Sequence, residues 1–158
     1  MATLTQRYET LYTQGRERLT DWLDAVDDTD LARRLHPDAN TLAWLLQHIG
    51  EVELLFVKNV FGHDLTVKAH TIGPYGGRRQ QFGSAHEQRA LLEHSGRLLH
   101  DAIGSQSEAD WSRTVTADFG TKSLQEALSL IITHTAYHAG QARLTLHYGT
   151  SPPSETRV

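Results

Sequence analysis

Four stretches of the sequence repeat apolar residues every three or four positions, which is the pattern of an amphipathic helix. Four helices that each carry one apolar face bury those faces best against one another, so the sequence predicts an all-α four-helix bundle. The apolar spacing and the capping residues place the four helices at about 4–26, 41–61, 84–104 and 123–149.

Local signals mark most of the predicted helix ends. Ser84 and Ser123 each stand three residues before a glutamate, which is the capping box that opens a helix. Gly104 and Gly149 stand where the third and fourth helices are expected to end. Acidic side chains between 24 and 30 disfavour a helix C-terminus, so the first helix is expected to end there. The apolar stripe of that helix contains Leu4, Tyr8, Leu11, Gly15, Leu19, Trp22 and Val26.

The predicted connections differ in length. About ten residues join the first two helices, and roughly twenty join each later pair, which is long enough for a crossover along the bundle. Segment 62–83 is either a plain surface loop or a loop that closes over a site and binds an anionic group through Arg78, Arg79 and Gln80. Residues 105–122 are expected to form either a short hairpin or a packed loop.

Composition limits the functions that such a bundle can have. The chain has 158 residues, 39% of them hydrophobic, which suffices for one packed domain. Residues 1–150 are expected to form that domain, with 151–158 as a flexible tail. The absence of cysteine excludes disulfides, thiolate metal sites, iron–sulfur clusters and cysteine nucleophiles. The net charge of −4 argues against nucleic acids and anionic membranes as partners.

The hydropathy pattern argues against a membrane or secreted protein. No apolar run reaches the length of about 18 residues that a transmembrane helix needs. The first residues of the chain also lack the apolar stretch of a signal peptide. We therefore expect a cytoplasmic protein.

Histidines are frequent, with 10 in the chain, and three of them lie at the margins of apolar stripes. His134 and His138 are four residues apart, so their Cβ atoms lie about 5–6 Å apart on one helix face. His48 has a similar place on the second helix. If these faces meet, three imidazoles converge and leave a fourth coordination position open, as in a catalytic zinc site. The alternative is a set of half-buried histidines that are hydrogen-bonded to their neighbours.

Two segments of the sequence resemble the DinB-like superfamily, which includes bacillithiol S-transferase-like proteins and mycothiol-dependent isomerases. Residues 41–51 (TLAWLLQHIGE) resemble the family's helix with a single metal histidine. Residues 134–141 (HTAYHAGQ) are similar to its H-x-x-x-H-x-G-Q signature. With the helix layout, the resemblance covers about residues 3–149. It implies a DinB-like bundle with a long crossover, a homodimer, and a divalent ion, zinc or nickel, bound by His48, His134 and His138.

Four further residues are candidates for the site. Gln141 shares the helix face of the histidine pair, so it could hydrogen-bond a ligand imidazole or make an ordinary interhelical bond. Glu51 follows His48 by three residues and could orient it, act as a general base, or be solvated. These two are the candidate catalytic residues. Trp44 and Tyr137 could line a pocket for a small-molecule ligand or serve only as packing aromatics.

Two residues of the predicted helices need a structural explanation. Glu53 falls among apolar residues of the second helix, where an unpaired charge is unfavourable. We expect it either to face an arginine or lysine across a dimer interface or to reach water at a helix turn. Gly140 is expected to permit close approach of a neighbouring helix.

Several functions are compatible with these features. The first is a metal-dependent thiol transferase, in which a low-molecular-weight thiol is a cofactor because the chain has no cysteine of its own. The second is a metal-dependent hydrolase acting on a small molecule. The third is a stress protein that binds a metal or ligand without catalysis, and the fourth is a helical dimer without metal.

Overall fold

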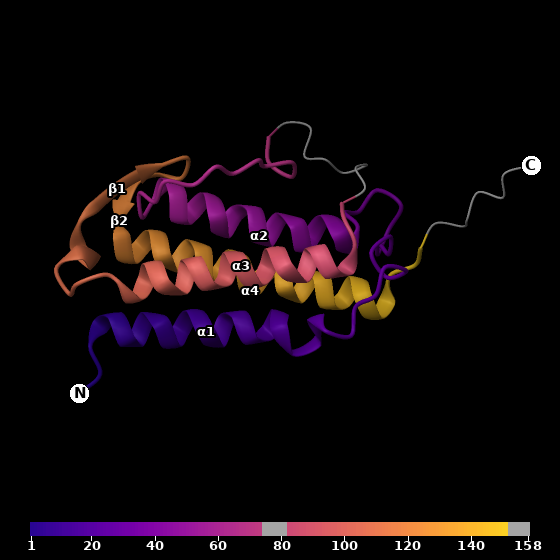
Figure 1. Cartoon of the computed structure of the whole chain (residues 1–158), viewed down its shortest axis with the longest axis horizontal. Coiled ribbons are helices and arrows are strands. Elements are labelled where there is room, and N and C mark those ends of the chain that lie inside the picture. Colours follow the sequence, from indigo (N-terminus) through magenta and orange to yellow (C-terminus); the bar gives the residue numbers. More distant parts are fainter. Residues whose placement is uncertain (74–81, 152–158) are drawn as a thin grey trace, which may run out of the picture.

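The computed structural model describes residues 1–73 and 82–151. Within them it contains four helices, a short 3-10 turn (Asp110–Ser112) and one hairpin (Figure 1). The bounds are α1 (Leu4–Leu23), α2 (Leu42–Asn59), α3 (Ala85–Gly104), β1 (Thr114–Ala117), β2 (Gly120–Ser123) and α4 (Leu124–Tyr148). The predicted all-α bundle is confirmed. None of the described helices is both long enough and apolar enough to cross a membrane.

The helices are arranged in two parallel pairs. α1 packs against α3 and α4, and α2 packs against the same two helices. α1 and α4 run in one direction and α2 and α3 in the other (Figure 1). Parallel neighbours cannot be joined by a tight turn, so residues 60–73 run back along α2 towards the start of α3 (Figure 1). This is the crossover that the length of the connection predicted. The proposed anion-binding residues Arg78, Arg79 and Gln80 lie outside the described residues.

Side-chain caps occur where they were predicted. The hydroxyls of Ser84 and Ser123 accept the backbone N–H of a glutamate three residues later, and that glutamate accepts the serine N–H in return. Thr41 caps α2 in the same way with its hydroxyl. Thr3 and Gln6 form a further capping box at α1. Each cap satisfies N–H groups that a helix leaves without partners, so these starts are encoded locally.

The glycine after α4 ends the helix for a different reason from the expected one. Gly149 has a φ of −71°, so it does not adopt the left-handed conformation of a glycine stop. A Cβ there would lie 2.3 Å from the carbonyl oxygen of Thr145 and 3.1 Å from the backbone nitrogen of Arg34. The close approach arises because Arg34 pairs with Thr150 in an isolated antiparallel bridge. By contrast, beyond the adjoining turns of its own helix, no described atom lies within 4 Å of a Cβ added at Gly140, so its expected packing role is wrong.

The first connection and one position on the buried face of α1 differ from the prediction. α1 ends at Leu23, and turns occupy the longer segment 24–41. Val26 is buried in that segment outside the helix, because apolar packing continues after the helical hydrogen bonds stop. Within α1, Leu19 and Trp22 are buried as predicted, but Leu11 is 51% exposed and Tyr12 is 2% exposed, so Tyr12 takes the place of Leu11 on the buried face.

Of the two structures expected for segment 105–122, the hairpin is the one observed. β1 and β2 pair in antiparallel register, with Ala117 opposite Gly120 next to the turn. Gly120 has a φ of +85°, which only glycine adopts readily. Trp111 precedes the hairpin, is 1% exposed and packs edge-on against Tyr8, with ring centroids 4.5 Å apart. The hairpin therefore joins the core at one end of the bundle (Figure 1).

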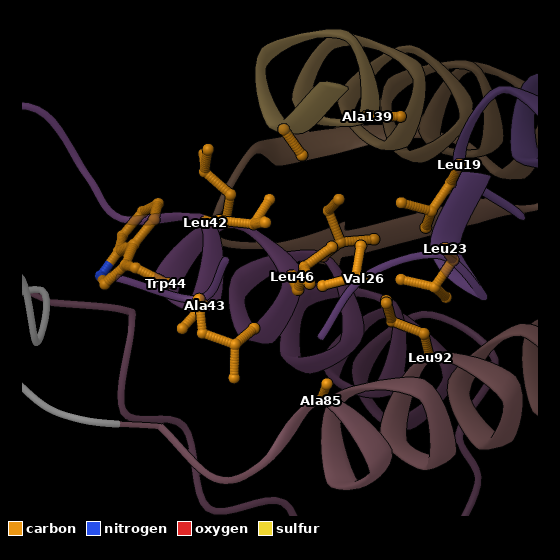
Figure 2. Close-up of a cluster of buried hydrophobic side chains, with 14 of the residues drawn as sticks. Leu19, Leu23, Val26, Leu42, Ala43, Trp44, Leu46, Ala85, Leu92 and Ala139 are labelled. Carbon is orange, nitrogen blue, oxygen red and sulfur yellow. The ribbon is translucent and has the colours of Figure 1, made fainter. Parts of the chain in front are cut away.

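The core consists of two apolar clusters. Leu19, Leu46 and Leu92 belong to one of them (Figure 2), and Leu99 and Leu128 to the other. On every helix, a polar or charged residue that is buried or nearly so lies between the positions that contribute to the two clusters. These residues are Arg16 on α1, Glu53 on α2, Ser95 on α3 and Thr135 on α4.

Glu53 is the centre of this polar layer. Its side chain is fully buried and forms an ion pair with Arg16. The carboxylate also accepts hydrogen bonds from Tyr12 Oη at 3.1 Å, Ser95 Oγ at 2.6 Å and Thr135 Oγ1 at 3.1 Å. The expected partner across a dimer interface, or water at a turn, is therefore wrong, because the cation comes from α1 of the same chain. The other three helices of the bundle each contribute at least one group to this carboxylate of α2.

Candidate metal centre

α2 and α4 bring His48, His134 and His138 together on one side of the bundle. The Nε2 atoms of His48 and His134 are 3.1 Å apart. The ring of His138 lies 4.8 Å from that of His48 and 4.5 Å from that of His134, measured between centroids. One nitrogen of each ring lies within 4.8 Å of the other two. Across residues 1–73 and 82–151, no other three His, Cys, Asp or Glu side chains converge in this way.

The donor set and its spacing fit a divalent ion. Zinc–nitrogen bonds of about 2.0–2.1 Å place two ligands of a tetrahedron about 3.3 Å apart. The 3.1 Å between the Nε2 atoms of His48 and His134 is close to that value. Three imidazoles suit zinc, nickel, iron and copper, and three ligands leave a coordination position for another group. His48, His134 and His138 would hold the ion.

Gln141 and Tyr137 form a hydrogen-bonded chain with His138. The Nδ1 atom of His138 lies 2.7 Å from Gln141 Oε1, and Gln141 Nε2 donates to Tyr137 Oη at 2.9 Å. An amide oxygen only accepts, so His138 carries its proton on Nδ1 and its Nε2 is free for an ion. Gln141 thus lies where it orients a candidate ligand, while its catalytic role stays a prediction. Tyr137 is 61% exposed at the rim of the site.

The other two histidines have different surroundings. Trp44 stacks on His48, with ring centroids 4.6 Å apart and an interplanar angle of 17°. Its indole is buried and forms one wall beside that ligand. His134 shares a hydrogen bond with His48 through its Nε2 atom. Its buried Nδ1 atom has no hydrogen-bond partner in the described part of the chain. Its ring orientation therefore depends on packing and on whatever Nε2 binds.

Of the three roles considered for Glu51, the solvated one is wrong, and a contact with His48 is only indirect. Glu51 is 2% exposed and faces the crossover, where it accepts the backbone N–H groups of His70 and Thr71 and the Thr71 hydroxyl. It reaches His48 only through Thr71, whose Oγ1 lies 3.1 Å from His48 Nδ1. Burial acts to raise the pKa of Glu51, but bonds from Thr71, Gln47 and the backbone outweigh it and lower that pKa. A carboxylate so occupied is a poor general base.

Burial keeps the three candidate ligands neutral. The pKa of His48 and that of His134 are lowered to about 4, mainly by burial and to a smaller extent by the proximity of His138. Burial also lowers the pKa of His138, against the opposing effect of its hydrogen bond to Gln141. Neutral imidazole is the form that binds metal ions, so protons compete weakly for this site near pH 7.

We expect the affinity for Zn²⁺ or Ni²⁺ to fall by less than about fivefold between pH 7.5 and pH 6.0. Three histidines with an ordinary pKa of about 6.5 would lose roughly fiftyfold, because all three must be neutral at once. The lowered pKa values of His48, His134 and His138 remove most of that competition. Competition with a chromophoric chelator at both pH values measures the ratio. A loss near fiftyfold would show that the imidazoles titrate as solvated groups.

The chain matches a known protein family in sequence and solved structures in fold. The sequence model of the DinB superfamily matches residues 11–142. Among solved structures, a conserved protein from Enterococcus faecalis superposes with a TM-score of 0.73 at 15% sequence identity, covering 94% of this chain and 98% of that chain. No curated protein matches the chain.

A second solved structure is a mutant of mycothiol-dependent maleylpyruvate isomerase in which one histidine is replaced by alanine. It superposes with a TM-score of 0.67 at 20% identity, and the match covers 96% of this chain and 65% of that chain. This chain is thus similar to part of the isomerase, and at such identity the likeness concerns the fold. The family match spans most of the sequence and agrees with the helix arrangement, and the chain therefore belongs to the DinB superfamily.

Proposed function

We propose that the protein is a metal-dependent transferase that joins the sulfur of a low-molecular-weight thiol to an electrophilic small molecule. The observation that carries the proposal is the convergence of His48, His134 and His138, which are half-buried and hence reachable from solvent. The ion would be zinc or nickel. The likeness to a protein named for its dependence on mycothiol supports the choice of a thiol.

The chemistry follows from the residues present. A divalent ion held by the three imidazoles lowers the pKa of a thiol bound to it, so that the sulfur is a nucleophilic thiolate at neutral pH. The chain contains no cysteine, so that sulfur must come from a free thiol. Trp44 lies against His48 and excludes water from that side of the ligand. Tyr137 accepts a bond from Gln141, so its hydroxyl proton remains available to a polar group of the bound molecule.

The surroundings favour thiol transfer over hydrolysis. A metal-dependent hydrolase is aided by a base that takes a proton from water beside the ion. Glu51 is buried and faces the crossover, and His70 is bonded to it at 3.1 Å. In the part of the chain that the structure describes, no carboxylate is hydrogen-bonded directly to any of the three histidines. A thiol depends less on such a base, because its pKa is about 8.5 before any ion acts on it, far below the value of about 15.7 for water.

The test is a coupled measurement of thiol and electrophile. The protein loaded with zinc or nickel is mixed with N-acetylcysteine and a chromogenic aryl halide, and the thioether is measured. The thiolate sulfur forms the new carbon–sulfur bond as the halide leaves, and the thiol proton passes to buffer. We expect turnover that needs the ion and is lost when His134 and His138 are replaced by alanine.

Control reactions separate the alternatives. His94 is exposed on α3, so His94→Ala is expected to retain full activity. Cleavage of a chromogenic ester without added thiol would favour the hydrolase. Tight binding of metal with no turnover in either reaction would favour a stress protein that binds a metal or ligand.

We further propose that the protein is a homodimer. Leu130 and Leu144 are 42% and 51% exposed on the outer face of α4, and a second copy would cover them. Light scattering of the purified protein at several concentrations reports this state directly.

A further inference from the structure

We infer that Thr71 is a positioning residue for the candidate ligand His48, because its single hydroxyl group links the buried Glu51 carboxylate to the His48 ring. The inference rests on the proposed metal site, but it concerns the geometry of the ligand and not the reaction. Nothing in the sequence marks Thr71, since it lies in a connection without apolar periodicity.

The direction of the hydrogen bonds follows from the number of protons. An ionised carboxylate only accepts, and the Thr71 hydroxyl lies 2.5 Å from Glu51 Oε2, so its one proton points to Glu51. The Thr71 oxygen can then only accept from His48 Nδ1, which lies 3.1 Å away. Nδ1 of His48 therefore carries the proton of the neutral ring. Its Nε2 is left with a free lone pair, on the side where it meets Nε2 of His134.

Backbone contacts hold the Thr71 hydroxyl in this place. The N–H of Thr71 donates to Glu51 at 2.9 Å, and the N–H of His70 donates to both carboxylate oxygens at 3.0 Å. Thr71 is only 3% exposed, so water does not compete for its hydroxyl. The crossover is thus fastened to α2 at the residue that touches the ligand.

The carboxylate is itself fixed from the opposite side. Gln47 donates to Glu51 Oε1 at 2.8 Å, and Gln88 of α3 donates to Gln47 at 3.1 Å. A side-chain relay therefore runs from α3 through two residues of α2 to Thr71. Supporting bonds of this kind fix the tautomer and orientation of a metal-binding imidazole.

The relay is tested with three substitutions. Thr71→Val keeps the shape and backbone N–H but removes the hydroxyl, whereas Thr71→Ser restores it. Thr66→Val is the matched control, because Thr66 is exposed on the same crossover and bonds to none of these groups. We expect Thr71→Val to weaken Ni²⁺ binding by about 10–100-fold. Thr71→Ser and Thr66→Val are expected to stay within about threefold of the unsubstituted protein.

Two further readouts distinguish positioning from general damage. Absorption of the Co²⁺-loaded protein reports ligand geometry, and we expect Thr71→Val to change its shape and Thr66→Val to leave it unchanged. In metal-free protein, nitrogen NMR of the His48 ring is expected to show the Nδ1–H form, and Thr71→Val to abolish its dominance. This second measurement needs no metal, so it tests the relay even if the protein binds none and the proposed function fails.

The inference is overturned by either of two results. One is a Thr71→Val protein that keeps both its Ni²⁺ affinity and the Nδ1–H form of His48. The other is an unsubstituted protein in which His48 carries its proton on Nε2. If Thr71→Val does not fold, Glu51→Gln takes its place, because an amide cannot accept all the bonds that the carboxylate accepts.

Discussion

Replacing Arg16 with methionine is expected to lower the free energy of unfolding by about 3–5 kcal/mol, measured by urea denaturation at pH 7. Methionine keeps much of the side-chain volume but leaves the Glu53 carboxylate charged and fully buried. The hydroxyl donors of Tyr12, Ser95 and Thr135 remain, yet none of them supplies a positive charge. The variant therefore retains the desolvation penalty of the carboxylate and loses the attraction that offsets it.

An exposed arginine gives the matched control. Arg97 pairs with Glu93 on the surface of α3, where the two side chains are 61% and 72% exposed. Arg97→Met is expected to change stability by no more than about 0.5 kcal/mol, because solvent screens such a pair. Adding Glu53→Met to Arg16→Met should recover part of the loss, since the unpaired charge is then gone. An Arg16→Met effect below about 1 kcal/mol would show that water reaches Glu53.

Replacing His134 and His138 together with alanine is expected to reduce bound metal from one ion per chain to none. The pair supplies two of the three nitrogen donors from one helix face, and His48 alone cannot chelate an ion. The loss should far exceed the roughly 10–100-fold that removal of a supporting hydrogen bond causes. Mass spectrometry of untagged, chelator-free protein after exposure to zinc and nickel measures the content.

Two comparisons make this experiment decisive. His100→Ala removes an exposed histidine of α3 and is expected to leave metal content and melting temperature unchanged. The double variant should keep the melting temperature of the metal-free protein within a few degrees, because both side chains are only half-buried at the edge of the bundle. If the unsubstituted protein takes up neither zinc nor nickel, the histidines are packing residues and the metal-dependent proposals fail.

Local signals account for the parts of the fold that the sequence predicts. The caps at Thr41, Ser84 and Ser123 depend on residues three positions away, so they are visible without tertiary structure. The pairing of His134 with His138 is equally local, because a spacing of four residues fixes both on one helix face. The convergence with His48 required only that the margins of two apolar stripes meet.

The features that the sequence did not reveal depend on distant residues. Arg16 lies four residues after Tyr12 and three before Leu19, so its place on the buried face was a signal that it needed an acidic partner. The choice of Glu53 as that partner depends on how α1 and α2 align in the bundle. Local sequence patterns do not predict this alignment. Thr71 gave no signal at all, because its role comes from a backbone path along α2.

The separation of the ligands in the chain has a thermodynamic consequence. His48 and His134 are 86 residues apart, so an ion joining them ties the second helix to the last one. Because the unfolded chain does not bring these residues together, ion binding favours the folded state by mass action, by about 4 kcal/mol at a thousandfold excess of free ion over its Kd. In a chain without cysteine, such an ion would take the place of a covalent cross-link. The supply of free metal around the protein would then add to the stability that the packed bundle has without it.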